Sequence, residues 1–387
     1  MADKKNAVPA IALIVVATVI AATFWPQRKT PDPFGLGPIP KVELSESLTE
    51  SIRRVRDHQL AYVTNTLSRS IYVVDLDDGS LLGTVLLGGD SIIGPGGIDI
   101  TPDGGLLYVT RGKFCNDVLV INITSFGIVK QIPVGKYTGF VKINADGTEA
   151  YVLGSHYEDT NVYVIDLRTN EVAHEIELDD QPYCAALSPD GGILYVTTDR
   201  GVVYIDTETH EVTRIIEMDT ECIKRIAVHP DGGKIYVTYH RDEEGHWPSV
   251  QVFDAATGDR VDIIENLTRR AFPEGTISCI AVSPDGAFIY ATDASGRLLS
   301  VVDASTNEVQ SRTDMNLSEY TDFDPGEIFF SPDGSLACLV YYGAIPIDAP
   351  GKQSPSLIAV IDARTHDMVG VITLDEWAGA CWMVFAP

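Results

Sequence analysis

The stretch HRDEEGH at residues 240–246 gathers four side chains that can bind a metal ion. His240, Glu243, Glu244 and His246 bring two imidazoles and two carboxylates together within this short segment. In helical zinc sites two histidines four residues apart share one face of a helix, whereas these two are six apart in a segment of loop composition. The four residues are therefore weak candidate ligands, and we expect no metal site.

The other motifs give no catalytic signature. The aspartates of DFD at 322–324 lack the further oxygen ligands of a calcium-binding loop. No nucleophile elbow, phosphate-binding loop or dinucleotide-binding glycine pattern occurs. The cysteines form neither CxxC nor CxxCH, which argues against a zinc ribbon or an attached haem; they are Cys115, Cys184, Cys222, Cys279, Cys338 and Cys381. We expect no cofactor, and the motifs favour a protein that is not an enzyme, although that question stays open.

The composition describes a strongly acidic protein with enough apolar residues for a large core. The 387 residues carry a net charge of −27 with a pI near 4.5, and 45% of them are hydrophobic. A surface this negative repels phosphate backbones and anionic lipid head groups, so we expect no nucleic-acid partner. It attracts cations and basic partners, and a salt-adapted host explains the charge equally well.

An apolar segment near the N-terminus predicts a membrane crossing or an export signal. Residues 7–25 contain no charged side chain, and a helix of this length spans about one bilayer. Basic residues flank the segment in equal number, so they do not orient it. We interpret 1–25 as a membrane anchor or a cleaved signal peptide, and 26–56 as a Pro/Gly-rich linker with a short helix. The body, 57–387, is then expected outside the cytoplasm, at the cell surface or in the periplasm, and secreted if the segment is cleaved.

The body consists of one repeated unit. A turn of the PDG type recurs every 41 to 54 residues, and in five of six copies a tyrosine follows five residues after the aspartate. A second mark, the end of a VIDxxT-like strand, occurs seven times. The turn aspartates are Asp103, Asp146, Asp190, Asp231, Asp285 and Asp333, and the strand ends are Asp75, Asn122, Asp166, Asp206, Asp254, Asp303 and Asp362. Four short strands in each unit predict an all-β, seven-bladed β-propeller of four-stranded blades, preceded by the transmembrane or signal segment.

The repeated aspartates and the two ends of the body have expected structural roles. A carboxylate at a strand end can accept bonds from the amides of the following turn, so we expect these residues to shape turns. The segment GACWMVFAP at 379–387 matches the inner strand of other units and would complete the blade begun by AYVTN at 61–65. SIRRVRD at 51–57 is the alternative inner strand, but its charges suit a capped helix better.

The repeats resemble those of YVTN-family β-propellers, which occur in archaeal and bacterial cell-surface and periplasmic proteins. The resemblance rests on AYVTN, LYVTR, LYVTT and IYVTY joined to SPDG and VIDxxT, and it covers about 57–387. It implies a fold and says little about function. One blade, AYVLGSHYEDTNVYVIDL at 150–167, is also similar to the propeller subunit of quinohaemoprotein amine dehydrogenases.

Function is expected on the loops that vary in length, because rigid scaffolds present their recognition residues on loops. The second-to-third-strand loops and the loops between blades emerge on one face, and the long ones are 87–97, 239–250, 266–278, 316–327 and 341–357. The longest come from the last three units, where we place the site. Their aromatic and charged residues form the candidate binding surface: Tyr239, His240, Glu243, Glu244, His246, Trp247, Arg269, Arg270, Phe272, Tyr320, Asp322, Phe323, Asp324, Tyr341, Tyr342 and Trp377. We expect this face to bind a protein or glycan partner.

Four unusual residues share one position of the predicted inner strands. Cys184 and Cys279 lie six residues before their turn aspartates, and Arg225 and Glu327 hold the equivalent position in other units. They can line the mouth of a central channel or fill the wedge between blades, and we expect the second arrangement.

Three functions remain open at this point. We favour an exported, membrane-anchored binding scaffold. The first alternative is an enzyme or enzyme subunit, either the propeller subunit of an extracytoplasmic oxidoreductase of the amine-dehydrogenase kind or a lactonase-like hydrolase. The second is a structural protein of the cell envelope.

Overall fold

The structure of the chain is a computed structural model that describes most of the repeated body. The described residues are 43–44, 59–87, 96–111, 115–154, 158–218, 225–239, 248–269, 276–293, 298–315, 317, 325–342, 356–374 and 380–387. None of the described residues belongs to a helix that could cross a membrane. The apolar segment 1–25 lies outside the described residues, so its role as anchor or signal stays a prediction.

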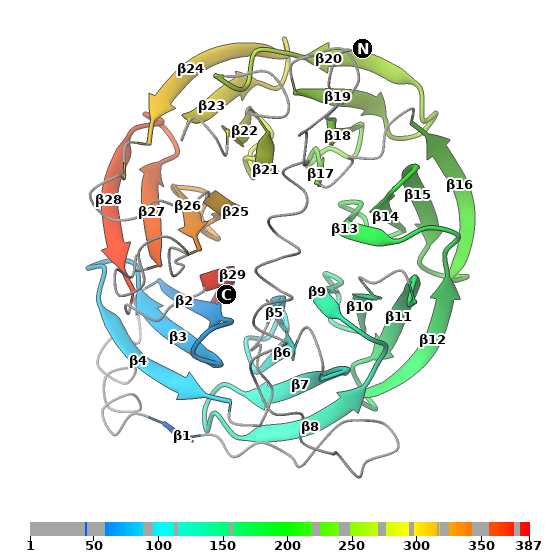
Figure 1. The fold of residues 1–387 in the computed structure, drawn as a ribbon, viewed down its shortest axis with the longest axis vertical. Coiled ribbons are helices and arrows are strands. Elements are labelled where there is room, and N and C mark those ends of the chain that lie inside the picture. Colours follow the sequence, from blue (N-terminus) through cyan, green and yellow to red (C-terminus); the bar gives the residue numbers. More distant parts are fainter. Residues whose placement is uncertain are drawn as a thin grey trace, which may run out of the picture.

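Seven antiparallel sheets stand around a central axis as the blades of a propeller (Figure 1). From the axis outward the strands of a blade are called a, b, c and d. Blade 1 consists of β29 (Ala380–Phe385), β2 (Leu60–Asn65), β3 (Ser70–Asp75), β4 (Leu81–Leu86) and the additional β1 (Glu43–Leu44). The predicted all-β, seven-bladed fold with four-stranded blades is confirmed.

The six other blades are continuous in sequence, with strand a first. Blade 2 consists of β5 (Ile98–Ile100), β6 (Leu106–Thr110), β7 (Asp117–Asn122) and β8 (Ile128–Pro133). Blade 3 consists of β9 (Thr138–Ile143), β10 (Glu149–Gly154), β11 (Asn161–Asp166) and β12 (Glu171–Glu177). Blade 4 consists of β13 (Pro182–Leu187), β14 (Ile193–Thr198), β15 (Gly201–Asp206) and β16 (Glu211–Glu217).

The second half of the ring repeats this order. Blade 5 consists of β17 (Ile226–Val228), β18 (Lys234–Tyr239), β19 (Ser249–Asp254) and β20 (Arg260–Ile264). Blade 6 consists of β21 (Ile277–Val282), β22 (Phe288–Asp293), β23 (Leu298–Asp303) and β24 (Glu308–Asp314). Blade 7 consists of β25 (Pro325–Phe330), β26 (Leu336–Tyr341), β27 (Leu357–Asp362) and β28 (Met368–Thr373).

The repeated aspartate and asparagine positions end the c strands of all seven blades, as predicted. Asp166, for example, accepts hydrogen bonds at Oδ1 from the backbone amides of Arg168 and Thr169 at 2.8 and 2.9 Å. Each of the seven side chains accepts at least one such bond from its turn. The structural role predicted for these residues is therefore confirmed.

The PDG turns close the hairpins between strands a and b. In the turn of blade 4, Asp190 Oδ1 accepts bonds from Ser188 Oγ at 2.6 Å and from the amide of Gly192 at 3.0 Å. Gly191 has a φ of 75°, a conformation that residues with a Cβ rarely adopt. The recurrent glycine of the motif is thus required by the geometry of the turn.

The ring is closed by strands from the two ends of the body. β29 pairs antiparallel with β2, with Ala61 opposite Phe385 and Val63 opposite Met383. The predicted C-terminal inner strand is therefore confirmed, and the alternative at 51–57 lies outside the described residues. Within the segment interpreted as a linker, β1 adds a fifth strand to the outer edge of blade 1 by pairing with β4.

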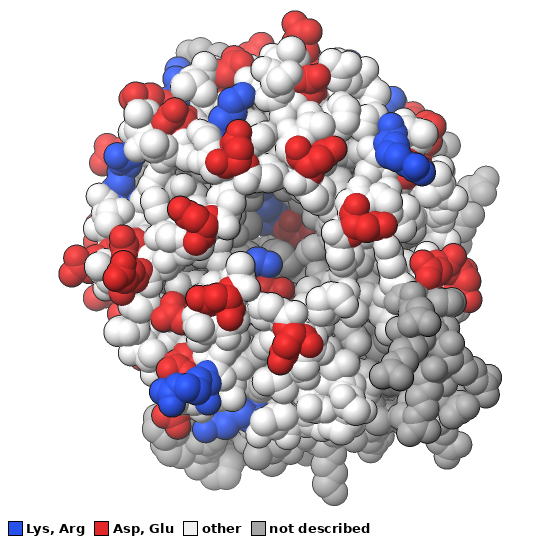
Figure 2. Space-filling model, turned by 180° about the vertical axis from the view of Figure 1, so that it is seen from behind, with Lys and Arg blue, Asp and Glu red and all other residues white. Residues whose placement is uncertain are grey.

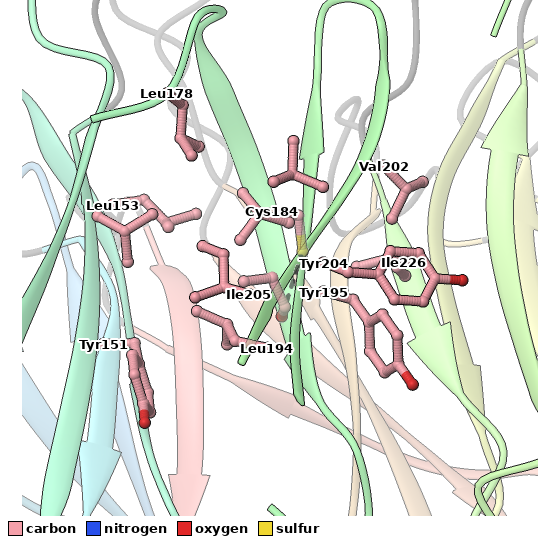
Figure 3. Close-up of a cluster of buried hydrophobic side chains, with 14 of the residues drawn as sticks. Tyr151, Leu153, Leu178, Cys184, Leu194, Tyr195, Val202, Tyr204, Ile205 and Ile226 are labelled. Carbon is pink, nitrogen blue, oxygen red and sulfur yellow. Dashed lines mark hydrogen bonds between the residues drawn. The ribbon is translucent and has the colours of Figure 1, made fainter. Parts of the chain in front are cut away.

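The hydrophobic core lies between neighbouring blades, where the faces of the sheets meet. In Figure 3, Tyr151 and Leu153 of blade 3 lie beside Leu194 of blade 4 in one cluster of buried side chains. Tyr195 and Tyr204 of blade 4 pack edge to face with their ring centroids 4.8 Å apart. Apolar contacts between neighbouring blades, such as those of this cluster, recur around the ring and hold each blade against the next.

The repeated tyrosines of the b strands also connect neighbouring blades. Tyr108 of blade 2 donates a hydrogen bond to Asn170 in the c–d turn of blade 3 at 2.5 Å. The hydroxyl of Tyr290 in blade 6 lies 2.7 Å from His366 Nδ1 in the c–d turn of blade 7. Sequence analysis had used these tyrosines only to align the repeats, and the structure gives two of them a role in joining blades.

Candidate functional site

A cavity of about 360 Å³ lies on the axis of the ring, between the inner strands. Residues from β5, β9, β13, β17, β25 and β29 line it, so six of the seven blades contribute. Figure 2 shows a hollow at the centre of one face of the molecule, with basic and acidic side chains inside it. We call this space the axial cavity.

The axial cavity opens on the face formed by the PDG turns and the c–d turns. Within the ring, all residues outside the described ranges fall between strands b and c or between blades. In Figure 2 most residues around the hollow are described, so this is the opposite face, where the short turns lie. The loops with the predicted binding residues emerge on the other side of the ring.

An ion pair and two thiols from four consecutive blades form a cluster that borders the axial cavity through Cys184 and Glu327. Arg225 Nε lies 2.7 Å from Glu327 Oε1 and forms an ion pair with it. Cys279 Sγ donates to Glu327 Oε2 at 3.0 Å and accepts from the amide of Ile328 at 3.1 Å. Cys184, on the next blade before Arg225, lines the cavity. The inner-strand position singled out in the sequence therefore forms one polar cluster.

The charge states of this cluster follow from burial and from the ion pair. Burial raises the pKa of Cys184 to about 11, and burial together with the nearby Glu327 raises the pKa of Cys279 well above its usual value. Burial alone would lower the pKa of Arg225, but Glu327 and the thiols outweigh it and hold that pKa above its usual value. At neutral pH the arginine is charged, and both thiols are protonated and poorly nucleophilic.

A second ion pair lies two residues further along the inner strands, closer to the PDG turns. Lys142 Nζ of β9 lies 3.1 Å from Asp99 Oδ2 of β5. The backbone amide of Ile143 donates to the same oxygen at 2.8 Å. The Asp99 side chain is 8% exposed and that of Lys142 is 48% exposed, so the lysine is the accessible partner. This pair also connects the inner strands of blades 2 and 3.

Aromatic rings form part of the cavity wall, and Trp382 packs against two of them, Phe140 and Phe329. The ring centroid of Trp382 lies 5.6 Å from that of Phe140 and 6.1 Å from that of Phe329, with interplanar angles of 82° and 65°. The backbone amide of Trp382 donates to Thr64 Oγ1 at 3.2 Å, across the closure of the ring. The β29–β2 pairing thus positions the tryptophan, and the rings are tilted against one another rather than stacked in parallel.

The axial cavity can therefore hold a small ligand by stacking and by polar contacts. Its aromatic wall is flanked by two ion pairs whose charges cancel. Within the part of the chain that the structure describes, no group of three or more His, Cys, Asp and Glu side chains is arranged to hold a metal ion. Interiors of this kind, mostly apolar with a few polar groups, are typical of small-molecule sites.

Six aspartates, one in each PDG turn, lie on the face where the axial cavity opens; we call them the acidic rim. All six side chains belong to exposed residues, and Figure 2 shows acidic residues around the opening. Hydrogen bonds from side chains or backbone amides of the turns lower the pKa of each carboxyl, as at Asp190, so all are charged at neutral pH. The members are Asp103, Asp146, Asp190, Asp231, Asp285 and Asp333.

Most residues of the predicted loop surface lie outside the described residues. These are His240, Glu243, Glu244, His246, Trp247, Arg270, Phe272, Tyr320, Asp322, Phe323, Asp324 and Trp377. The set includes all four weak metal-ligand candidates. Their role in binding a protein or glycan partner therefore stays a prediction.

Four members of that surface are described. Tyr239 ends β18 and Tyr342 follows β26, and both are half-buried. Arg269 is exposed and donates to Asp314 Oδ2 at 2.7 Å. Tyr341 is fully buried in β26. Its ring belongs to the core of blade 7 and presents no surface to a partner.

The inner-strand residues are divided between the two expected arrangements. Glu327 lines the axial cavity, and Cys184 lines it while also belonging to the buried cluster of blades 3, 4 and 5. Cys279 is buried in the cluster between blades 6 and 7, as expected. The inner strands converge on one axis, so a single position can face both the neighbouring blade and the channel.

Sequence analysis missed several residues that line the axial cavity. Asp99 and Lys142 lie four residues before their turn aspartates, a position that is alanine in three other blades, at Ala186, Ala227 and Ala281. A charged residue where the repeat has alanine is a signal that could have found them. Trp382 gave no comparable signal, because its place beside the cavity depends on the closure of the ring.

Comparisons with known proteins support the fold. The family described as SMP-30/Gluconolactonase/LRE-like region matches residues 156–337. The seven-bladed beta-propeller protein Rv1057 of Mycobacterium tuberculosis is 27% identical over 288 residues, which cover 64% of this chain and 68% of that protein. The chain is similar to both, and the second is itself named for the seven-bladed fold.

A comparison of structures agrees. A chain of hydrazine synthase from Kuenenia stuttgartiensis superposes with a TM-score of 0.56 over 70% of this chain and 76% of that one, at 19% sequence identity. A similarity at this level of identity concerns the fold alone. The resemblances to YVTN repeats and to the amine-dehydrogenase propeller stay predictions.

Proposed function

We propose that this protein is an exported, membrane-anchored propeller that binds a small ligand in its axial cavity. The observation that carries the proposal is the cavity itself, about 360 Å³, whose lining includes Trp382 with Phe140 and Phe329 packed against it, the Asp99–Lys142 ion pair, and Glu327, which is paired with Arg225. Its polar groups come from separate blades, which supports a site that the closed ring builds as a whole. The loop face on the other side of the ring is proposed to bind a protein or glycan partner.

The chemistry of the cluster around Glu327 supports binding over catalysis. The two thiols are protonated at neutral pH, so neither offers a ready nucleophile. Glu327 is paired with Arg225 and accepts a hydrogen bond from Cys279. Groups that are paired in this way fix the shape and polarity of a site.

The proposed location rests on the uncharged segment at residues 7–25. Protease treatment of intact cells should degrade the propeller if it lies outside the cytoplasm. Membrane fractionation should recover the full chain with the membranes if the segment is an anchor. Recovery of an intact, protease-resistant chain from the cytoplasm would contradict export.

Thermal unfolding with a panel of small polar and aromatic compounds tests the proposed site. A ligand that binds only the folded state raises Tm, and the stabilisation grows with the logarithm of its concentration over Kd. Hits should lose their effect on a Trp382→Leu variant and keep it on Val369→Ala, which changes an exposed side chain on the outer strand β28. Hits that stabilise all three proteins equally would contradict a site in the axial cavity.

A lactonase-like hydrolase is a second candidate, favoured by the family match over residues 156–337, which include Arg225, Cys279 and Glu327. In that reaction water adds to the lactone carbonyl, the ring C–O bond breaks, and Glu327 would move the proton from the water to the departing alkoxide. Hydrolysis of simple lactones should then fall by about 100-fold or more in Glu327→Gln and stay unchanged in Glu308→Gln, an exposed position on β24. Equal rates in both variants would exclude this role.

A further inference from the structure

We propose that the ligand of the axial cavity is a small organic cation with an alkylated ammonium head, which enters through the acidic rim and rests against Trp382. The proposal depends on the binding function proposed above and specifies its ligand class. Three features carry it: the charge around the entrance, the neutral interior and the aromatic wall.

The entrance selects for positive charge. The six PDG turns contribute one aspartate each, and none has a lysine or arginine within two residues of that aspartate. These carboxylates surround the face on which the cavity opens, on a protein whose net charge is −27. Clefts bordered by one sign of charge concentrate ligands of the opposite sign and raise their association rates. An anion approaching by the same route is repelled.

The interior does not reverse this selection. Arg225 is paired with Glu327 and Lys142 with Asp99, so the cavity adds no net charge of its own. A cation that has passed the acidic rim meets no excess of positive charge.

The aromatic wall supplies the contact that distinguishes an ammonium head from a neutral group. Aromatic faces carry negative electrostatic potential, and tryptophan attracts cations most strongly. Trp382 meets Phe140 and Phe329 at interplanar angles of 82° and 65°, so the rings form corners rather than a parallel stack. A rounded alkylated ammonium fits against such a corner better than a flat ring system does.

The size of the axial cavity agrees with a ligand of this class. A volume near 360 Å³ corresponds to about a dozen water molecules. That space holds a trimethylammonium group with a short polar arm. A neutral polyol could stack on Trp382 and use the same ion pairs, but it would gain nothing from the acidic rim.

Three probes of nearly equal shape separate charge from shape. Choline is the cation, 3,3-dimethylbutan-1-ol has carbon in place of the nitrogen, and 3,3-dimethylbutyrate is an anion of similar bulk. Affinities for the full chain are measured by calorimetry at about 20 and 300 mM salt. Choline should bind at least about 10-fold more tightly than the alcohol at low salt, and the difference should shrink at high salt because the rim is screened. The butyrate should bind most weakly.

Variants locate the contact and the entrance. Trp382→Leu should weaken choline binding by about 3- to 30-fold, with its thermal unfolding recorded to show that the ring is still closed. The double variant Asp190→Asn with Asp285→Asn should weaken choline binding at low salt by about two-fold for each charge removed. This estimate takes about 10 Å of water between each carboxylate and the bound ammonium. Asparagine keeps the Oδ1 that both aspartates use in their turns. Asp259→Asn, in an outer turn, is the control and should change nothing.

The outcomes separate the ligand class from the binding function. If the alcohol binds as tightly as choline, or if Trp382→Leu binds choline like the wild type while folded, the cation proposal is overturned. In the first case the axial cavity remains a binding site. If no probe binds and no compound of the wider panel raises Tm, the binding function itself is overturned.

Discussion

Removal of residues 380–387 should unfold the whole ring, because β29 is the inner strand of blade 1. The strand brings Met383 and Phe385 into the core, where they are 1% and 8% exposed, and Trp382 and Val384 are partly buried beside them. It also supplies the ladder partners of Ala61 and Val63 on β2. The truncation therefore removes a packed strand and exposes the edge of the one behind it.

The loss can be estimated from the burial of these side chains. Full burial of a large apolar side chain contributes about 1.5–3 kcal/mol. Two fully buried and two half-buried side chains together contribute about 5–9 kcal/mol by that rule, against a total of about 5–15 kcal/mol for most folded proteins. The truncated chain should therefore retain little or none of the native structure at room temperature.

Thermal and urea unfolding followed by circular dichroism provide the assay. Met383→Ala should cost about 2–5 kcal/mol by leaving a cavity, and the matched Met383→Leu should cost less than about 1.5 kcal/mol. A truncated chain that melts at the same temperature as the full chain would refute the closure of the ring by β29. A Met383→Ala variant as stable as Met383→Leu would refute the estimate of packing.

Three further predictions concern side chains between and within the blades. Tyr290→Phe should lower the free energy of unfolding by about 1 kcal/mol, since it removes a hydrogen bond to blade 7. Tyr236→Phe should be nearly neutral in urea unfolding, because its hydroxyl has no hydrogen-bond partner among the described residues. Equal losses in the two variants would contradict the role of Tyr290 in joining blades 6 and 7. Burial raises the pKa of Cys184 and Cys338 to about 11 and 12, so neither thiol should react with Ellman's reagent in the native protein at pH 8. Cys184→Ser and Cys338→Ser should therefore leave the number of reactive thiols in the native protein unchanged, and each should lower the number in guanidinium by one. A native reaction that depends on either residue would contradict their burial. The free energy of unfolding should be constant below about pH 9 and fall as the pH rises toward 12, because the unfolded chain ionises cysteine near 9 and tyrosine near 10 while the folded pKa of Tyr236 is about 12. At the acid end, hydrogen bonds from Ser331 and Ser335 lower the pKa of Asp333 to about 2. The stability that this carboxylate contributes should therefore be present above about pH 4 and be lost as the pH falls toward 2.

The fold could be read from the sequence because its turns repeat the same chemistry. An aspartate that caps a turn and a glycine with positive φ recur in fixed register, and both signals are local. The end of every c strand was therefore predictable to the residue, from Asp75 to Asp362. The inner strand at 380–385 could also be assigned, because GACWMVFAP repeats the pattern of YCAALSP.

The candidate site was less accessible to sequence analysis. The axial cavity takes one or a few side chains from each blade, so its members are separated by whole repeats. Arg225 and Glu327 form an ion pair across the inner strand of the blade between them, and no local pattern relates the two. Loop length directed attention to the opposite face, because variation in length is visible in a sequence and a hollow on an axis is not.

The strand β1 illustrates the same limit on a smaller scale. Residues 43–44 lie in a segment whose composition indicates a linker, yet they pair with the outer edge of β4. An open sheet edge can accept a short strand of almost any composition, because the contacts are made by the backbone. Sequence analysis detects the edge and not the segment that covers it.

A crystal structure of the full chain soaked with trimethylselenonium tests the central claim most directly. This cation matches the bulk of a trimethylammonium head, and its selenium is located by anomalous scattering. The proposal predicts one strong anomalous peak in the axial cavity, against Trp382 and between Phe140 and Phe329, which is lost in Trp382→Leu. A strong peak elsewhere on the chain with none in the cavity would contradict it.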